Sequence, residues 1–493
     1  MTDSTSLSCP ALVGGLLLLC ATTAIAGPVY QPPGTNLTYG DVTHGQAAQS
    51  ASSNPAAAAA DRARQIDEPK SSAVISAAGG LEYGNVQNLF DFYDNLAGGY
   101  EPSDPGTGGG PGQDPGDKPD TGIDLGIIWD SLDPDVQGTI EAIGKEIVTQ
   151  AALLALIRED GYGKTWLAAN VPVQFGNDRF GGTWTLEASW SGASKSFGVV
   201  QPIDFDEAAA ESALQDWLLN NPTNLPRGVE LNGQVRLTID ALTNAVKFGL
   251  ANDSSMLSKA VQTTELSLGY SRRGWSNDSG ALYLGAEARL YMMRLSRFSV
   301  RFGDITNSEE LFDAIRNSNF RNAERAGLDI GALWVADNYQ LGIQLTNLNQ
   351  PKFSFPTVNL DPYVNEEIIN YLQTDQSYTM DRQVKLEGSL FTSDRRWSAH
   401  LGLDADSATD PLGDDFQWLT LSAAYATDSR WIPAARIGYR ENLTGTEMKY
   451  LSVGVTAFKF VNFDISSALD TVKIDGKKLP QGIMASIGFQ ISW

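Results

Sequence analysis

The sequence predicts an all-β protein: a transmembrane antiparallel β-barrel of about 14 strands, with an N-terminal helical plug segment and helices in its long loops. Three observations indicate this fold. Apolar and polar residues alternate from Lys164 onward. Short and long connections alternate along the same region. The final twelve residues, GIMASIGFQISW, place Ile483, Ile487, Phe489 and Trp493 on one side of a strand. A closing strand needs a lipid face and an interfacial aromatic, so we expect Phe489 and Trp493 to close the barrel.

Composition excludes several classes of protein. The chain has 493 residues and a formal net charge of −24, which argues against nucleic acid as a partner because nucleic-acid binding needs a basic surface. No apolar stretch is long enough for a membrane helix. The 48 glycines and 11 tryptophans are typical of strands, turns and interfacial girdles.

Residues 1–26 resemble a secretory signal peptide. Ala11 to Leu19 form a short apolar core, and Ala24-Ile25-Ala26 is a small-residue cleavage site before Gly27. The segment before the core carries Asp3 and no basic residue, which is atypical of a signal or indicates a misplaced start; a buried apolar helix is the alternative. The cysteines, Cys9 and Cys20, lie in this segment, so the mature chain is expected to form neither disulfides nor thiolate metal sites.

Three segments precede the predicted barrel. Residues 27–100 are rich in small residues and contain Asn54-Pro55-Ala56, a turn signal, and a strand candidate at Ser71–Tyr83. Residues 101–122 form a Pro/Gly/Asp linker that lacks the ligand spacing of an EF-hand. Residues 123–162 contain an amphipathic helix from Pro134 to Arg158, and we expect this helix and the N-terminal segment to plug or cap the barrel.

Residues 163–493 form the predicted outer-membrane barrel. Short turns such as Asp337-Asn338 and Ser393–Arg396 fall on the side where the chain ends, which would be periplasmic, and long polar loops fall on the other. Helices are expected in three long loops, at Phe205–Leu219, Glu309–Phe320 and Pro362–Leu372. The alternating stretches begin at Leu167, Trp184, Leu231, Leu266, Leu282, Leu328, Leu341, Val384, Trp397, Leu419, Ala435, Leu451, Val461 and Ile483.

Charged residues in these strands are expected to face the lumen, because charges facing lipid are strongly penalised. Their mixed signs indicate a salt-bridged interior, which either stabilises the wall or lines and gates a passage. The candidate lumen-lining residues are Glu187, Arg236, Glu265, Glu287, Arg289, Asp329, Lys385, Glu387, His400, Arg436 and Asp464.

Little in the sequence indicates catalysis. The histidines His44 and His400 are far apart in the chain and make neither a zinc site nor a convincing base–nucleophile pair. His400 and Ser398 share a strand face, which raises the alternative of an outer-membrane lipid hydrolase, but no third orienting group is visible. We therefore expect no catalytic residues, no metal and no cofactor.

The chain resembles the TraF-like conjugal-transfer outer-membrane proteins, which belong with the wider FadL-type transporters. The stretches that carry the resemblance are SSNPAAAA (Ser52–Ala59), GKTWLAANVPV (Gly163–Val173) and the region from Ala326 to Pro351. In FadL-type transporters an Asn-Pro-Ala element lies in the N-terminal hatch, and Asn54, Pro55 and Ala56 match it. The linker at 101–122 departs from the transporter pattern.

The resemblance implies a non-enzymatic protein of the Gram-negative outer membrane that serves in transport or envelope assembly. Its expected partners are outer-membrane lipid and the barrel-assembly machinery. A FadL-type channel for hydrophobic small molecules, such as long-chain fatty acids, is the alternative. A secreted all-β binding protein, whose apolar strand faces form a sandwich core, is a further one.

Overall fold

The computed structural model describes residues 34–44, 47–64, 71–84, 161–177, 181–201, 229–231, 235–239, 246–304, 319–374, 376–427, 429–474 and 477–493. The predicted signal peptide with both cysteines, the linker at 101–122 and the helices predicted at 134–158 and 205–219 lie outside these residues. No helix in the described ranges is both long and apolar enough to cross a membrane.

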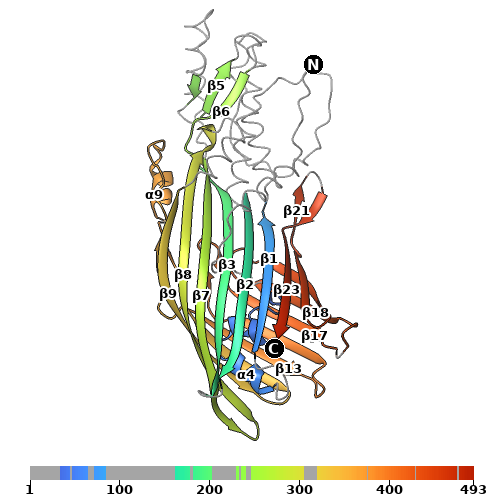
Figure 1. The fold of residues 1–493 in the computed structure, drawn as a ribbon. Coiled ribbons are helices and arrows are strands. Elements are labelled where there is room, and N and C mark those ends of the chain that lie inside the picture. The colour runs from blue at the N-terminus through green and yellow to red at the C-terminus, as the bar shows by residue number, and fades with distance from the viewer. Residues whose placement is uncertain are drawn as a thin grey trace, which may run out of the picture.

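Fourteen strands form a closed antiparallel barrel, in which each strand pairs with its neighbours and the last pairs with the first (Figure 1). The strands are β1 (Ser71–Tyr83), β2 (Tyr162–Asn177), β3 (Gly182–Val199), β7 (Ser255–Asn277), β8 (Gly280–Arg301), β9 (Phe320–Val335), β10 (Tyr339–Thr346), β13 (Gln383–Phe391), β14 (Trp397–Asp404), β17 (Trp418–Tyr425), β18 (Ala434–Asn442), β19 (Lys449–Ala457), β20 (Val461–Ala468) and β23 (Gly482–Ser492).

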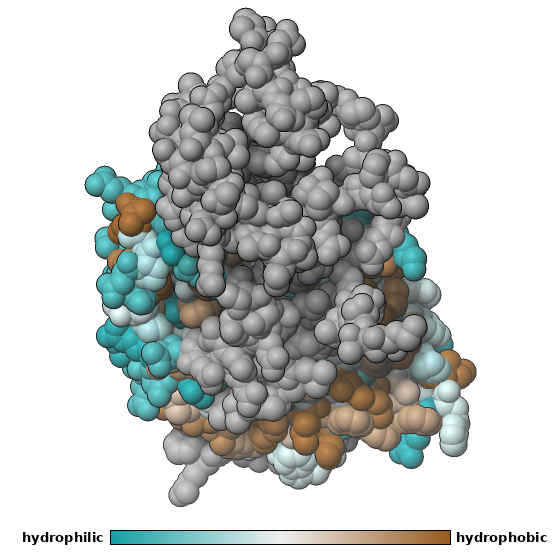
Figure 2. Space-filling model, turned by 90° about the horizontal axis from the view of Figure 1, so that it is seen from above, coloured by the Kyte–Doolittle hydropathy of each residue, from teal (hydrophilic) through white to brown (hydrophobic). Residues whose placement is uncertain are grey.

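The outer face of the barrel is apolar because alternate residues of each strand point outward. On β23, Ile483, Ile487 and Phe489 are exposed while Met484 and Ser486 are buried. The same alternation continues around the wall, where Leu341 on β10 is 57% exposed beside a fully buried Gln340. Seen from above, apolar residues follow the lower and right rim of the molecule (Figure 2). This pattern confirms the predicted transmembrane barrel and excludes a sandwich core.

The wall has two heights (Figure 1). The tall wall, β2, β3, β7, β8 and β9, has strands of 16 to 23 residues. The short wall, β10, β13, β14 and β17 to β20, has strands of 8 or 9 residues. On the outside of the tall wall, apolar residues such as Leu290 and Leu328 give way to Arg294 and Glu324, both exposed. The tall wall therefore continues beyond the apolar band.

Short turns join the strands at the end where β23 finishes, and the longer connections lie at the other end (Figure 1). The longer connections carry the remaining elements. These are β4 (Val229–Leu231), β5 (Val235–Ile239) and β6 (Val246–Leu250) in one sheet, η2 (Phe302–Asp304), β11 (Lys352–Ser354) paired with β12 (Ser377–Thr379), α9 (Glu366–Thr374), β15 (Ala408–Thr409) paired with β16 (Asp415–Phe416), and β21 (Thr471–Ile474) paired with β22 (Lys477–Pro480).

The strand membership differs from the prediction in two places. The barrel begins at β1, in the segment assigned to the N-terminal region, and not at residue 163. Leu231 and Val235–Ile239, predicted as one barrel strand, belong instead to the separate sheet β4–β5–β6, so Arg236 is not in the barrel wall. Alternation in a small sheet looks the same as alternation in a barrel, whereas the small outward residues of β1, such as Ala73 and Ala77, weaken its apolar signal.

One of the predicted loop helices is present, and a second cannot extend to its predicted end because that residue begins a strand. Helix α9 begins at Glu366, four residues after Pro362, because Asn365 caps it: its Oδ1 accepts a hydrogen bond of 3.1 Å from the Ile368 amide. The helix predicted at Glu309–Phe320 lies mostly outside the described residues, and Phe320 itself begins β9.

Three short helices lie inside the barrel and form what we call the plug, residues 34–44 and 47–64. They are α2 (Asn36–Tyr39), α3 (Ala47–Ser53) and α4 (Ala57–Arg64). Helix α2 contacts β17 to β20 and β23, α3 contacts β1 to β3, and α4 contacts β2, β3 and β7 to β9. Leu37, Thr38 and Ala58 are completely buried. The plug observed here is thus formed by an N-terminal segment that precedes the first strand, whereas the helix at 134–158 that was also predicted to plug or cap the barrel lies outside the described residues.

Candidate functional site

Charged groups of the short wall hold the plug. The Lys385 ammonium pairs with the Asp41 carboxylate. The Glu387 carboxylate accepts hydrogen bonds from the Thr43 amide at 2.5 Å and hydroxyl at 2.9 Å, and from Asn54 Nδ2 at 2.7 Å. Hydrogen bonds to charged groups are about twice as strong as neutral ones, so these residues fix the plug in one position.

A second set of short-wall residues binds helix α2. Arg436 Nε and Nη2 donate to both carboxylate oxygens of Asp464, at 2.9 and 3.0 Å. The Thr38 hydroxyl donates to the same carboxylate at 2.6 Å. Both members of this ion pair are buried, and the plug supplies a further hydrogen bond to its carboxylate.

The two histidines of the chain meet at this contact. The Tyr39 ring of the plug stacks on His44, with ring centroids 4.4 Å apart, and meets the edge of His400 on β14 at 5.0 Å. His44 Nε2 lies 3.1 Å from both Thr35 Oγ1 and Asn36 Oδ1. Burial lowers the pKa of His44 well below its usual value, and the nearby His400 and Arg436 lower it further. His44 is therefore neutral at neutral pH.

The Asn-Pro-Ala element forms the turn between α3 and α4. Asn54 Oδ1 accepts a hydrogen bond of 3.0 Å from the Ala56 amide, and its backbone carbonyl accepts one of 2.9 Å from the Ala57 amide. Its Nδ2 remains free to reach Glu387 across the lumen. One asparagine thus both shapes the turn and attaches it to the wall.

Glycines on the inner wall make room for the plug. A Cβ at Gly331 would overlap Asn54 Oδ1 and lie 3.1 Å from Pro55 Cδ, and a Cβ at Gly285 would overlap the Pro55 carbonyl. Across the lumen, a Cβ at Gly402 would lie 2.8 Å from the Val42 side chain. The wall is therefore shaped to receive this segment at close backbone distance, on both its tall and its short side.

The tall wall carries an acidic cluster of its own. The Arg289 guanidinium pairs with Glu265, with Glu287 at 2.8 Å and with Asp329 at 2.8 Å. Glu187 on the next strand accepts a hydrogen bond of 2.9 Å from Asn170 Nδ2. All four carboxylates are less than 10% exposed, and three of them share one guanidinium.

A chamber of about 250 Å³ lies between the plug and the loops above it. Asp41 and Ser53 of the plug border it, Glu187 and Arg289 line its side, and Tyr378 from the β12 region lies on the loop side. A second cavity, of about 420 Å³, lies at the short-turn end beside Tyr39 and His400.

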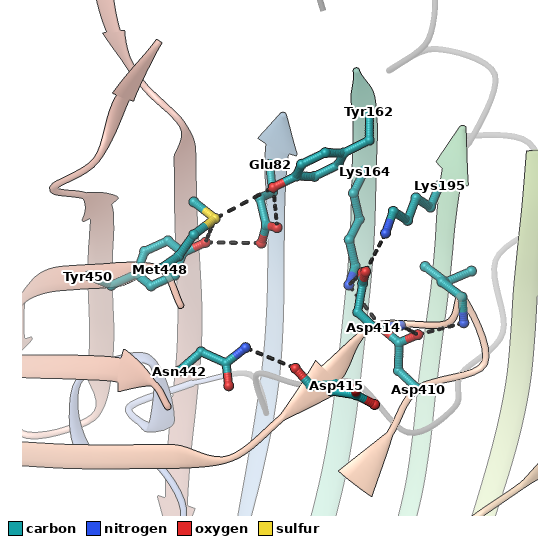
Figure 3. Close-up of polar contacts among 11 residues, drawn as sticks. Glu82, Tyr162, Lys164, Lys195, Asp410, Asp414, Asp415, Asn442, Met448 and Tyr450 are labelled. Atoms are coloured by element: carbon teal, nitrogen blue, oxygen red, sulfur yellow. Dashed lines mark hydrogen bonds and ion pairs between the residues drawn. The ribbon is translucent and has the colours of Figure 1, made fainter. Parts of the chain in front are cut away.

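The loop that contains β15 and β16 crosses the barrel from the short wall to the tall wall (Figure 3). Lys164 on β2 pairs with Asp410 at 3.0 Å and with Asp414 at 2.7 Å, and Lys195 on β3 also pairs with Asp414. Burial alone would raise the pKa of Asp414, but the two ammonium groups hold it at about 2. We call these four residues the loop clamp.

Apolar and aromatic residues pack above the polar lumen. Phe353, Phe416, Trp418 and Tyr450 belong to one buried cluster that joins the loops to the wall. Beside it, the Glu82 carboxylate accepts hydrogen bonds of 3.0 Å from the hydroxyls of Tyr162 and Tyr450 (Figure 3). The described part of the lumen is thus filled from below by the plug and covered from above by inward-folded loops.

The structure divides the predicted lumen residues into two groups. Lys385, Glu387, His400, Arg436 and Asp464 line the short wall, where all five contact plug residues. Glu187, Glu265, Glu287, Arg289 and Asp329 lie together on the tall wall. Arg236 joins neither group. Sequence reasoning missed Asp41, the loop clamp and the inner glycines, and no local pattern marks them.

Two further predicted features are also placed by the structure. Both nitrogens of His400 face serines, Ser389 Oγ at 2.8 Å and Ser398 Oγ at 2.9 Å, so no carboxylate orients the ring as hydrolysis would require. Phe489 lies on β23, which pairs with β1, and Trp493 exchanges two backbone hydrogen bonds with Ser71, of 2.9 and 3.1 Å. The described ranges contain no group of three or more His, Cys, Asp or Glu residues suited to a metal ion.

The chain was compared with known proteins. No curated protein matches it. Among solved structures, a TodX monoaromatic hydrocarbon channel mutant lacking S2 and S3 is 8% identical with a TM-score of 0.41, and covers 94% of this chain and 99% of its own. A FadL homologue of Pseudomonas aeruginosa is 13% identical with a TM-score of 0.33, and covers 95% and 100%. The family model described as "F plasmid transfer operon, TraF, protein" matches residues 51–406, most of the barrel and part of the plug, and the chain therefore belongs to that family.

Proposed function

We propose that this protein is a non-enzymatic transport protein of the bacterial outer membrane, kept closed by its plug until the plug shifts. The observation that carries the proposal is the fit between plug and wall. Charged and polar residues of the wall, among them Lys385, Glu387 and Asp464, contact the plug, and glycines leave space for it. The apolar outer band with aromatic residues at its edge, such as Trp397 and Trp493, supports the membrane location.

The proposal is tested by displacing the plug without touching the outer face. Gly331→Leu places a side chain where Asn54 and Pro55 lie. We expect this variant to conduct ions in planar lipid bilayers, where the native protein is closed for most of the time. Gly388→Leu is the matched control, because a Cβ at Gly388 meets only Leu341, at 3.6 Å.

Folding is checked by the mobility shift on heating that folded membrane barrels show in electrophoresis. A folded Gly331→Leu barrel that stays as closed as the control would overturn the proposal. If Gly331→Leu does not assemble, deletion of residues 34–64 gives the same test: a folded deletion variant without added conductance contradicts a plug role.

Uptake of hydrophobic compounds is a second candidate, favoured by the buried apolar cluster around Phe353, Trp418 and Met484. A deletion strain complemented with the native protein should then take up radiolabelled long-chain fatty acid faster than one with the empty vector. Equal uptake by the two strains would remove this candidate.

The family match favours a third and broader role, in conjugal transfer or envelope assembly. In that role the barrel requires outer-membrane lipid and the barrel-assembly machinery as partners. Deleting its gene should lower plasmid transfer between cells at least tenfold, and an unchanged transfer frequency would exclude a conjugal role.

A further inference from the structure

The chamber above the plug carries an excess of negative charge. Seven Asp and Glu residues line it in the described part of the chain, against Arg289 and Lys385. Lys385 pairs with Asp41 and Lys164 with Asp410, so these carboxylates are neutralised. The tall-wall cluster is different, because Glu265, Glu287 and Asp329 share Arg289 as their ion-pair partner while Glu187 beside them accepts a hydrogen bond from the neutral Asn170 side chain.

A buried oxygen of Glu187 marks the place where a positively charged ligand group could bind. The residue is 93% buried and lines the chamber. Its Oε1 accepts the hydrogen bond from Asn170, but its Oε2 is buried and has no hydrogen-bond partner among the described residues. Buried carboxylate oxygens in native proteins are normally hydrogen-bonded, so this oxygen lacks one N–H or O–H donor.

Aromatic rings border the same chamber. Tyr291, Tyr378, Phe416 and Trp418 line it. Two of these rings already have a protein cation nearby: Lys164 Nζ lies 4.8 Å from the Phe416 centroid, and the Arg440 guanidinium lies 4.5 Å from the Trp418 ring. Aromatic faces attract cations through their quadrupole, so this level of the lumen favours positive groups by a second mechanism.

We propose that the chamber binds a small organic amine in its ammonium form. One ammonium N–H would donate to Glu187 Oε2, and the alkyl part would lie against the aromatic side. A metal ion fits less well, because the Arg289 guanidinium already occupies the space between Glu265, Glu287 and Asp329, where a metal would find its oxygen ligands. An amine supplies both the charge and the missing donor.

This inference names a chemical class for the compound that the proposed transporter would carry. The passage of the amine through the barrel rests on the proposed function, whereas its binding in the chamber does not. Binding and passage are separable. Amine binding in a barrel that Gly331→Leu does not open would keep the site and overturn the plug proposal. A Gly331→Leu barrel that opens, in a protein that binds no amine, would keep the plug proposal and overturn the amine site.

The test is isothermal titration calorimetry of the full chain in detergent with 1,4-diaminobutane, with n-butylamine as a monovalent probe. Butane-1,4-diol is the matched neutral probe, because it keeps the length and the hydrogen bonding but lacks the charge. We expect saturable binding of both amines and none of the diol. Glu187→Gln should weaken amine binding at least tenfold, while Asp394→Asn, in an exposed turn, should leave it unchanged.

Three results would overturn the inference. The first is the absence of saturable amine binding, as expected if protons neutralise the carboxylates. The second is equal binding of the diol. The third is displacement of the amine by equimolar NaCl or MgCl₂, which would indicate a general cation atmosphere. If Glu187→Gln does not fold, the comparison between amine and diol on the native protein still decides the question.

Discussion

The tall and short walls use their inward polar residues in different ways. The short wall directs Lys385, Glu387 and Asp464 to plug residues. Carboxylates of the tall wall pair instead with Arg289 of the same wall. A transmembrane strand needs about 9 to 11 residues, so the short strands end with the membrane while β7 and β8 continue beyond it.

This difference shows how one barrel can hold its plug with one wall and line the proposed binding chamber with the other. Because the short strands stop early, the loop bearing Asp410 and Asp414 can fold inward and reach Lys164 and Lys195 on the taller side. The chamber is thus covered by a loop of the short wall and lined by charges of the tall wall. Each wall can be altered separately, which allows the comparison to be tested.

The largest expected effect is at the closure between the walls, where β23 meets β1. Deleting Trp493 removes two backbone hydrogen bonds to Ser71 and an exposed aromatic anchor. We expect most of the heat-modifiable folded band to be lost from the outer-membrane fraction. Trp493→Phe should restore it, because the backbone and an aromatic ring remain. A normal yield from the deletion would show that closure does not depend on this residue.

The next largest effect concerns the loop clamp. Lys164→Met removes the ammonium group that pairs with Asp410 and one of the two that pair with Asp414, which should destabilise loop closure by about 3 kcal/mol. Hydrogen exchange of residues 408–416 measures this, with Lys352→Met, at an exposed lysine, as the control.

The clamp should also respond to strong acid. The pKa of Asp414 is lowered to about 2 in the folded protein, against about 3.9 for a free aspartate. Its stabilisation is therefore fully present above about pH 4 and is lost as the pH falls toward 2. Protection of the loop that is already lost at pH 5 would contradict this assignment.

A further comparison tests whether the tall wall extends beyond the membrane. Ile330 and Glu324 point outward from the same strand, β9, one within the apolar band and one above it. Ile330→Arg should lower the free energy of unfolding by about 2 to 4 kcal/mol, whereas Glu324→Arg should change it little. Denaturant titration in lipid vesicles compares them, and equal losses would mean that the tall wall does not leave the membrane.

The smallest effect concerns acid and the plug. The folded pKa of His44 lies below its usual value of about 6.5, so the released segment takes up a proton more readily. The plug is therefore bound most strongly above about pH 6.5, and its binding weakens as the pH falls below that. A positive charge on His44 inside the barrel is opposed by His400 and Arg436 nearby. We expect several-fold more channel opening at pH 5 than at pH 7.5, and none of this increase in His44→Gln. An increase that persists in His44→Gln would assign the response to another group.

The sequence predicted the barrel well because each strand carries its own alternation. The strand count was correct although Ser71–Tyr83 replaced Leu231–Ile239, since the two changes cancel. The inward direction of Glu187 and Arg289 follows from the same alternation. The contacts that define the site do not: Asp414 meets Lys164 from 250 positions away, and nothing local pairs them. Glycines such as Gly331 became informative when the plug was seen against them.

The attachment of the plug has a mechanical consequence. The plug ends at Arg64, shortly before β1 in the sequence, and Ser71, the first residue of β1, is hydrogen-bonded to Trp493, which follows β23. A force that draws the plug out toward the short-turn end would therefore act on the terminal pair of the β1–β23 junction. Because this force runs along β1, it loads the hydrogen bonds to β2 and β23 together, as in shear, and not one after another as in unzipping. Strand β1 is thus the part of the barrel on which plug withdrawal places the greatest load.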